Sequence, residues 1–197
     1  MLFRLDTLAR WRNARLQRCS WRCLEAEGVR YVFGIPGEET LDLSESLSDS
    51  SIQFVPVRHE QGGGYMADAY GRLTGRAGVC LGTLGPGATN LVTAVADAFL
   101  DRAPLVALTG QSDIERMHKE SHQYIDLLGI LKPVVKWNAR VSSPEIVPEV
   151  VRNAFAVAES EKPGATHLEL PEDVMARPLD ASPLPRHAPV QPETVAT

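Results

Sequence analysis

The sequence predicts an α/β fold with a doubly wound, mostly parallel sheet and helices on both faces. Short apolar runs alternate with segments of helical pattern along most of the 197 residues, and this alternation is typical of βα units. Right-handed crossovers then place helices on both faces of the sheet. Glycine and proline follow several of the apolar runs, as expected where a strand ends in a turn. The sequence shows no internal repeat.

Regular patterning begins with residues 23–29, which have the character of a helix end stopped by Gly28. Residues 29–35 are β-branched and aromatic, as in a strand. Residues 36–39 form a turn, because Pro and Gly stand at its centre. A helix is expected from Thr40, and its apolar positions are Leu41, Leu43 and Leu47.

The middle of the chain contains two further strands and two helices. Residues 52–57 are an apolar run typical of a buried strand, and residues 65–73 have the pattern of a helix. A strand over residues 78–83 leads into a glycine-rich turn at residues 84–90. Residues 91–100 form a largely apolar helix, which we expect to be buried between layers.

The last third predicts three strands and an amphipathic helix. Residues 104–110 and 165–171 are expected to form strands, and residues 134–141 have the pattern of a shorter one. Residues 115–131 hold a polar loop and a short helix. Residues 144–159 form an amphipathic helix whose inward positions are Ile146, Val147, Val150, Val151, Ala154, Phe155 and Ala158.

We expect one domain over residues 23–177, with different sequences on either side. Residues 1–22 hold six arginines against the single acid Asp6 and show no clean helical period after a first apolar turn. This stretch is interpreted as an atypical arginine-rich extension, although an acid-poor, arginine-rich start also permits a mitochondrial presequence. Residues 178–197 are rich in proline and predict a linker or tail.

Composition excludes several classes of function. Hydrophobic residues are 44% and charged residues 23% of the chain, which is ordinary for a globular protein. The net charge of −5 disfavours nucleic acid and anionic membranes as partners, and no apolar run reaches the roughly 18 residues of a membrane span. Cys19, Cys23 and Cys80 lack the paired spacing of a zinc site, and a reducing cytoplasmic setting fits them best.

The candidate site lies where three expected strands end. The special residues there are Pro36-Gly37-Glu38, His59-Glu60-Gln61 and the turn from Thr83 to Asn90. In a parallel sheet these strand ends meet at one edge, where ligands bind. A carboxylate followed by glycines that let a ligand approach the backbone makes Glu60 a candidate for acid–base work; the alternative is an acid that only stabilises the start of a helix.

Two other motifs are ambiguous. Gly82-x-x-Gly85-x-Gly87 precedes a helix, but its spacing matches no nucleotide-binding motif, and a tight turn against a planar ligand or a partner domain fits better. His118 and His122 stand four residues apart, yet no third metal ligand accompanies them. A polar surface or a substrate loop is the preferred interpretation, and no metal ligand is assigned.

Seven ordered segments together resemble the pyrimidine-binding (PYR) domain of thiamine diphosphate enzymes, most closely that of the acetolactate synthase group. The resemblance spans roughly residues 23–177. It rests on residues 25–29, 32–37, 58–62 (Arg-His-Glu-Gln-Gly), 70–75, 85–90 (Gly-Pro-Gly-Ala-Thr-Asn), 104–111, and on 162–164 followed by 170–174.

The resemblance implies roles for individual residues. Glu60 resembles the catalytic acid that hydrogen-bonds N1′ of the cofactor's aminopyrimidine, so that the 4′-nitrogen can take the proton from the thiazolium C2. Gln123 resembles a glutamine that faces the substrate, and Lys136 matches a lysine near the mouth of the active site. The remaining cofactor-binding positions implied are Pro36, Gly37, Thr83, Pro86, Gly87 and Asn90.

The resemblance implies decarboxylation of pyruvate and its condensation with a second 2-keto acid, a step of branched-chain amino acid biosynthesis. A related 2-keto acid decarboxylase or carboligase is the alternative enzyme, and a stand-alone assembly module is the alternative outside catalysis. The resemblance also implies a homodimer or higher homo-oligomer and Mg²⁺ held by a separate diphosphate-binding domain. It leaves FAD open as a further cofactor of the parent enzyme, since this sequence does not contain the region that would bind it.

Three features depart from the resemblance. The turn reads Gly37-Glu38-Glu39, where many biosynthetic relatives carry small residues, and residues 1–22 replace the usual first amphipathic helix. The sequence stops at the linker and holds no Gly-Asp-Gly…Asn metal motif. We therefore expect a fragment that is inactive alone.

Overall fold

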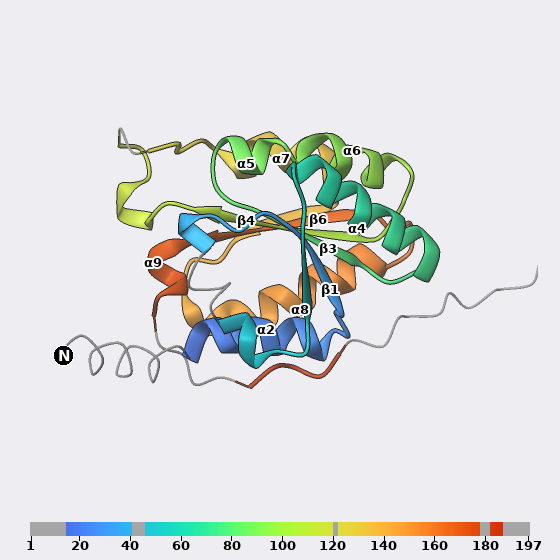
Figure 1. Cartoon of the computed structure of the whole chain (residues 1–197), viewed down its shortest axis with the longest axis horizontal. Helices are drawn as coiled ribbons and strands as arrows, with labels where there is room; N and C mark the ends of the chain where they lie inside the picture. The colour runs from blue at the N-terminus through green and yellow to red at the C-terminus, as the bar shows by residue number, and fades with distance from the viewer. Residues whose placement is uncertain (1–14, 41–45, 120–121, 178–181, 187–197) are drawn as a thin grey trace, which may run out of the picture.

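A computed structural model of the chain describes residues 15–40, 46–119, 122–177 and 182–186. Its centre is a six-stranded sheet in the order β2-β1-β3-β4-β6-β5, with every neighbouring pair parallel (Figure 1). This confirms the doubly wound α/β class. The strands are β1 (Tyr31–Gly34), β2 (Gln53–Pro56), β3 (Gly78–Gly82), β4 (Leu105–Gln111), β5 (Trp137–Arg140) and β6 (Ala165–Pro171).

The strand order reverses between β1 and β3. From β1 the chain moves outward to β2, whereas from β3 it moves the opposite way to β4. The connections after β1 and β3 therefore leave the sheet in different directions. Such a switch point is where open parallel sheets bind ligands.

Helices cover both faces of the sheet (Figure 1). The upper layer in the figure contains α4 (Glu60–Thr74), α5 (Pro86–Thr89), α6 (Val92–Leu100) and α7 (Leu127–Leu131). The lower layer contains α2 (Arg15–Ala26) and α8 (Val147–Glu159), and α9 (Glu172–Met175) follows β6. Short 3-10 turns complete the fold: η1 (Glu38–Thr40), η2 (Ser46–Asp49), η3 (Ile114–Arg116), η4 (Lys132–Val134) and η5 (Pro144–Ile146).

The two layers enclose two separate hydrophobic clusters. Beneath the sheet, Trp21 of α2 and Phe155 of α8 pack with Val106 and Leu168 of the central strands. Above it, residues of α4 and α6, together with Leu91 just before α6, pack on the opposite faces of β3 and β4. Because both faces are covered, the central strands are apolar along most of their length, which made them easy to predict.

Helix α2 begins inside the stretch for which we expected no helical period, so that expectation is wrong for residues 15–22. Trp21 is 1% exposed, Cys19 and Cys23 are also buried, and the helix packs against α8. The buried positions 19, 20, 23 and 24 recur at helical spacing, and the arginines at positions 15, 18 and 22 recur between them, so the helical period is present in this stretch after all. The expected extension over residues 1–14 and most of the tail after residue 177 lie outside the described residues.

Two other expectations need adjustment. The prediction that the helix of residues 91–100 is buried between layers is wrong, because α6 lies in an outer layer and its Leu100 is 73% exposed. Residues 41–45, where a helix was expected from Thr40, lie outside the described residues. Helix α4 begins at Glu60, five residues before the expected start at residue 65.

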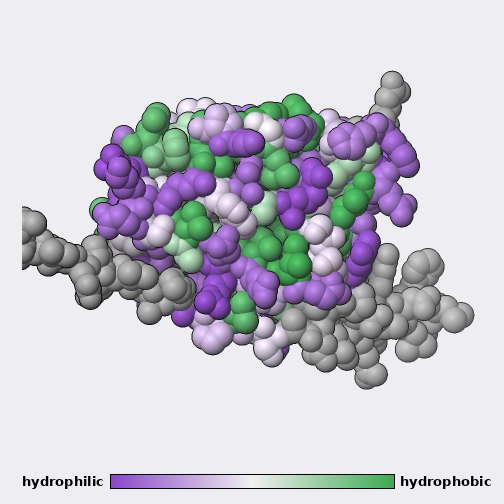
Figure 2. Space-filling view, turned by 180° about the vertical axis from the view of Figure 1, so that it is seen from behind, coloured by the Kyte–Doolittle hydropathy of each residue, from purple (hydrophilic) through white to green (hydrophobic). Residues whose placement is uncertain are grey.

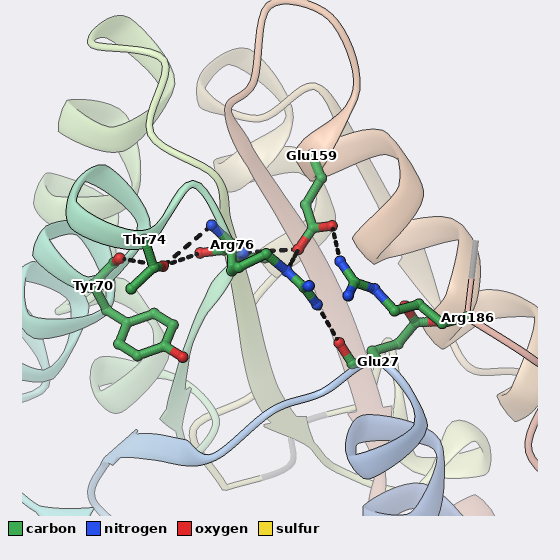
Figure 3. Close-up of polar contacts among 7 residues, drawn as sticks. Glu27, Tyr70, Thr74, Arg76, Glu159 and Arg186 are labelled. Carbon is green, nitrogen blue, oxygen red and sulfur yellow. Dashed lines mark hydrogen bonds and ion pairs between the residues drawn. The ribbon is translucent and has the colours of Figure 1, made fainter. Parts of the chain in front are cut away.

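An ionic cluster joins the two helices of the lower layer to the start of β3 (Figure 3). Arg76 donates from Nε to Glu159 Oε1 at 3.1 Å and from a terminal nitrogen to the carbonyl of Glu27 at 2.7 Å. Arg186, beyond β6, donates to Glu159 Oε2 at 3.2 Å. The carboxyl group of Glu27 is buried here, and burial together with the nearby charge of Glu159 raises its pKa to about 7.

Candidate functional site

Glu60 is the first residue of α4 and follows the carboxyl end of β2. His59 caps the helix, since its Nδ1 accepts a hydrogen bond from the backbone nitrogen of Gln61 at 3.2 Å. The Glu60 side chain is buried, with 8% of the residue exposed. Because Glu60 stands in the first turn of α4, its carboxylate lies at the positive end of the helix dipole, where a negative charge is favourable.

One oxygen of the Glu60 carboxylate is held by Asn90. The side-chain amide of Asn90 donates to Glu60 Oε2 at 2.9 Å. The other oxygen lies beside Gly87, where a Cβ atom would come within 3.3 Å of Glu60 Oε1. The structure thus brings together Glu60, Gly87 and Asn90, three residues that the sequence analysis placed in one site.

Glycines allow the turns after β1 and β3 to meet. A Cβ at Gly37 would lie 2.5 Å from Thr83 Oγ1, and a Cβ at Gly87 would lie 2.6 Å from Thr83 Cγ2. The hydroxyl group of Thr40 closes the first turn, because it accepts from the nitrogen of Gly37 at 2.9 Å and donates to the carbonyl of the same residue at 3.1 Å. Gly37 and Gly87 therefore flank Thr83 at the switch point, beside the exposed Pro36.

The sequence analysis overlooked Glu39 as a site residue. Its carboxylate accepts a hydrogen bond from the hydroxyl group of Thr83, so a side chain after β1 contacts one after β3. The site consequently contains two acids, Glu60 and Glu39. The only sequence signal was the pair of acids Glu38-Glu39 in the turn after an expected strand, which we noted as a departure from the resemblance.

The glycines after Glu60 have a different use from the one expected. A Cβ at Gly63 would come within 3.1 Å of the carbonyl of Phe33, and a Cβ at Gly64 within 2.6 Å of Cβ of Ala94. These two glycines let α4 approach β1 and α6 closely. Of the three glycines in this run, only Gly62 has open space around it, so the expectation that the run admits a ligand is wrong for Gly63 and Gly64.

Gln123 lies close to the glycine turn that precedes α5. Its backbone has φ of 54°, and Gly85, itself at φ of 53°, is so close that a Cβ there would lie 2.6 Å from the carbonyl oxygen of Gln123. Only a residue without a side chain permits this contact. Pro86, the next residue, is exposed at the start of α5. The structure thus places Gln123 against the turn that leads into Gly87 and Asn90.

The structure does not bring Lys136 to this site, which corrects its expected position at the mouth. Lys136 precedes β5, at the amino end of the sheet, whereas Glu60 lies at the carboxyl end. Its ammonium group donates to the carbonyl of Val157 and, at 2.9 Å, to Oγ of Ser160. Lys136 therefore binds the last turn of α8, where a cation satisfies terminal carbonyl groups.

The histidine pair forms no metal site in the part of the chain that the structure describes. The ring of His118 packs edge-on against Tyr124, with 5.7 Å between the ring centroids. Across the described ranges, no three His, Cys, Asp or Glu side chains come together in a way that could hold a metal ion. The helices in these ranges also include none with the length and apolarity needed to cross a bilayer.

Fold and site together define a ligand-binding α/β domain whose acid is presented by a helix start beside glycine-lined turns. Residues 16–130 match the family described as thiamine pyrophosphate enzyme, N-terminal TPP binding domain. The chain belongs to this family. The expected relationship to the PYR domain of thiamine diphosphate enzymes is thereby confirmed.

Similar proteins carry the name acetolactate synthase. The probable large subunit from Methanocaldococcus jannaschii is 42% identical over 179 residues, which are 88% of this chain and 30% of that protein. The catabolic enzyme from Raoultella terrigena is 45% identical over 82% of this chain and 29% of its own length. The acetolactate synthase isozyme 1 large subunit from Escherichia coli is 42% identical over 77% of this chain and 27% of its own length. The chain thus spans less than a third of the length of these relatives.

Proposed function

We propose that this chain is the PYR portion of an acetolactate synthase-like enzyme that decarboxylates pyruvate and joins it to a second 2-keto acid. The observation that carries the proposal is the buried Glu60 carboxylate, fixed by Asn90 at the switch point of the sheet. The similarity to acetolactate synthases from three organisms supports the choice of reaction. Its setting would be branched-chain amino acid synthesis in the cytoplasm.

The side chains fit the aminopyrimidine ring of thiamine diphosphate. Glu60 Oε1, beside Gly87, is the oxygen free to hydrogen-bond a ring nitrogen, because Asn90 already binds Oε2. Gly87 keeps the turn flat next to this oxygen, while Pro36, Gly37 and Thr83 line the opposite wall. When bound, the cofactor supplies a carbon nucleophile for a 2-keto acid and accommodates the electron pair left by CO₂.

Within this proposal, Glu60 moves a proton and Asn90 holds the carboxylate in place. A carboxylate hydrogen-bonded to a ring nitrogen shifts proton density across an aminopyrimidine, which is a general acid–base role. Gln123, held at the glycine turn, faces the keto-acid substrate. Mg²⁺ belongs to a diphosphate-binding domain that pairs with this one, and FAD to a further domain of the parent enzyme.

An apolar stripe on α4 supports a homodimer or a higher homo-oligomer. The outer face of this helix exposes Tyr65, Met66 and Leu73, the last at 87%, and Leu100 of α6 is exposed in the same layer. Hydrophobic residues also reach the surface among polar ones on the rear face of the molecule (Figure 2). Exposed apolar stripes of this kind mark protein interfaces.

A chimeric enzyme tests the proposed function. Residues 15–177 would replace the matching segment of the Methanocaldococcus jannaschii relative, and acetolactate formation from pyruvate would be measured. We expect turnover that depends on thiamine diphosphate and that Glu60→Gln reduces at least a hundredfold, a factor of about 10² being typical for the loss of one such group. The matched control is Glu115→Gln, which removes an exposed acid from η3. A folded chimera without turnover, or with turnover insensitive to Glu60→Gln, would reject the proposal.

A further inference from the structure

A buried polar layer lies on one face of β4, β6 and β5, beneath α7. The amino ends of β4 and β6 contribute apolar residues to this face, including Leu105 and Ala165. Their carboxyl ends contribute Gln111 and Glu169, both fully buried. The proposed chemistry uses neither of these residues, so their burial calls for another explanation.

Glu169 provides the anchor of this layer. Its carboxylate accepts from Gln111 Nε2 at 2.9 Å and pairs with Nε of Arg140 on the neighbouring strand β5. A buried carboxylate without such donors would be very costly. Because Glu169 is bonded from both adjacent strands, it offers Gln111 a fixed acceptor.

Gln111 uses three of its hydrogen-bonding positions. One Nε2 proton goes to Glu169, and the other goes to the carbonyl of Ile125 at 3.0 Å. Its Oε1 accepts from the backbone nitrogen of Ser112 at 3.0 Å. The side chain therefore ties the end of β4 to a loop fourteen residues further along the chain.

Ile125 stands two residues after Gln123, whose carbonyl rests against Gly85. The carbonyl of Ile125 also accepts from the nitrogen of Leu127 at 2.9 Å, where α7 begins. The segment of Gln123 is thus held between the glycine turn on one side and Gln111 on the other. A substitution of Gln111 would remove its hydrogen bond to Ile125 and leave only the contact with the glycine turn.

We propose that Gln111, anchored by Glu169, is a positioning residue that holds the 123–127 segment, and with it Gln123, against the glycine turn of the site. The role of Gln123 toward the substrate rests on the proposed function. The attachment of the segment does not, because it follows from the contacts of Gln111 alone.

Amide hydrogen exchange of the full chain tests the attachment. Gln111→Met keeps the size of the side chain and removes its donors, so the amide of Leu127 should exchange at least tenfold faster. Amides of β4, such as that of Leu108, should change less than threefold. Gln111→Asn, which shortens the side chain by one carbon but keeps it polar, should show the same pattern and serves if the methionine variant does not fold.

A further variant acts as a matched control. Asn138→Leu removes a donor to the carbonyl of Leu128 in α7, so it should leave the Leu127 amide within threefold of wild type. Unchanged exchange at Leu127 in both Gln111 variants, or a uniform increase across the domain, would overturn the proposal.

The chimera adds a functional readout for Gln111. There, Gln111→Met should raise the KM for pyruvate at least fivefold with kcat within threefold, because the substrate-facing residue loses its position while Glu60 does not. A fall in kcat with unchanged KM would contradict the positioning role. Absence of turnover in the parent chimera would instead reject the proposed function and leave the exchange result standing.

Discussion

The side-chain amide of Asn90 donates a 2.9 Å hydrogen bond to Glu60 Oε2, linking the end of α5 to the start of α4. The two residues belong to different βα units, so this bond depends on the sheet that aligns them. It leaves Glu60 Oε1 facing Gly87 as the oxygen available to a ligand. The geometry of the site therefore depends on a residue that performs no proton transfer itself.

Replacing Asn90 tests this dependence. Asn90→Leu removes the donor while keeping a side chain of similar size, so the Glu60 carboxylate loses its orientation. In the chimera we expect turnover to fall about 10- to 100-fold, as for the loss of a charge-assisted hydrogen bond in an active site. Steady-state kinetics measure the effect, and a change of less than threefold would show that Glu60 needs no such support.

The close packing at Gly87 predicts a loss of stability. The Cβ of Gly87→Ala would lie 2.6 Å from Thr83 Cγ2, and we expect a cost of about 1–3 kcal/mol in the free energy of unfolding. Adding Thr83→Ser removes that methyl group and should restore most of the loss. Urea unfolding measures both variants.

Gly62→Ala is the matched control for this experiment. Gly62 lies in α4, and nothing stands within 4 Å of the place that a Cβ would take there. Alanine should therefore stabilise the chain by about 0.5–1 kcal/mol, because it favours the helix. Equal destabilisation by alanine at both glycines would contradict the packing argument.

The raised pKa of Glu27 predicts that the folding stability of the chain falls as pH rises. Its pKa is about 7 in the folded chain, raised by burial and by Glu159, against an ordinary value of 4.5 when unfolded. Between these values the folded state binds more protons, so stability is lost as pH increases through this window. Glu27→Gln should therefore be more stable than wild type by about 1–3 kcal/mol at pH 8 and should lose this advantage below about pH 5. Thermal unfolding of wild type and Glu27→Gln at both pH values measures this difference.

For His167 we predict the opposite dependence on pH: its contribution to folding stability falls as pH falls. It is fully buried, Thr109 Oγ1 lies 2.8 Å from its Nε2, and burial lowers its pKa to about 3. Between this value and the ordinary one of about 6.5, only the unfolded state takes up the proton, so stability falls as pH falls. Relative to His167→Gln, wild type should lose on the order of 1.4 kcal/mol per pH unit between about pH 6 and pH 4. Parallel stability curves would show that His167 does not titrate on unfolding.

Local signals explain why much of the fold could be predicted. A strand buried on both faces is apolar throughout in the case of β3, while β6 keeps Leu168 and Leu170 among buried polar residues, and turn residues mark the ends of both strands. Residues 165–171 were therefore placed with the correct bounds. Helix α2 was missed before residue 23 although its residues follow the helical period, because the stretch is rich in arginine and its buried positions include Cys19 and Ser20, which are weak apolar signals.

The candidate site likewise contains residues that the sequence could predict and residues that it could not. Glu60, Gly87 and Asn90 follow from strand ends that meet at one edge of a parallel sheet. The contact between Glu39 and Thr83 spans 44 residues and the switch point, so no local pattern reveals it. Lys136 was placed by resemblance, whereas its position depends on where β5 begins, at the opposite edge of the sheet.

The central claim is that Glu60 activates bound thiamine diphosphate by acting on its aminopyrimidine ring. The most direct measurement is the rate of deuterium exchange at the thiazolium C2 position in the chimera, compared with its Glu60→Gln variant. We predict at least a hundredfold slower exchange in the variant, with the Kd for the cofactor changed less than about tenfold. Equal exchange rates in the two proteins would contradict the claim.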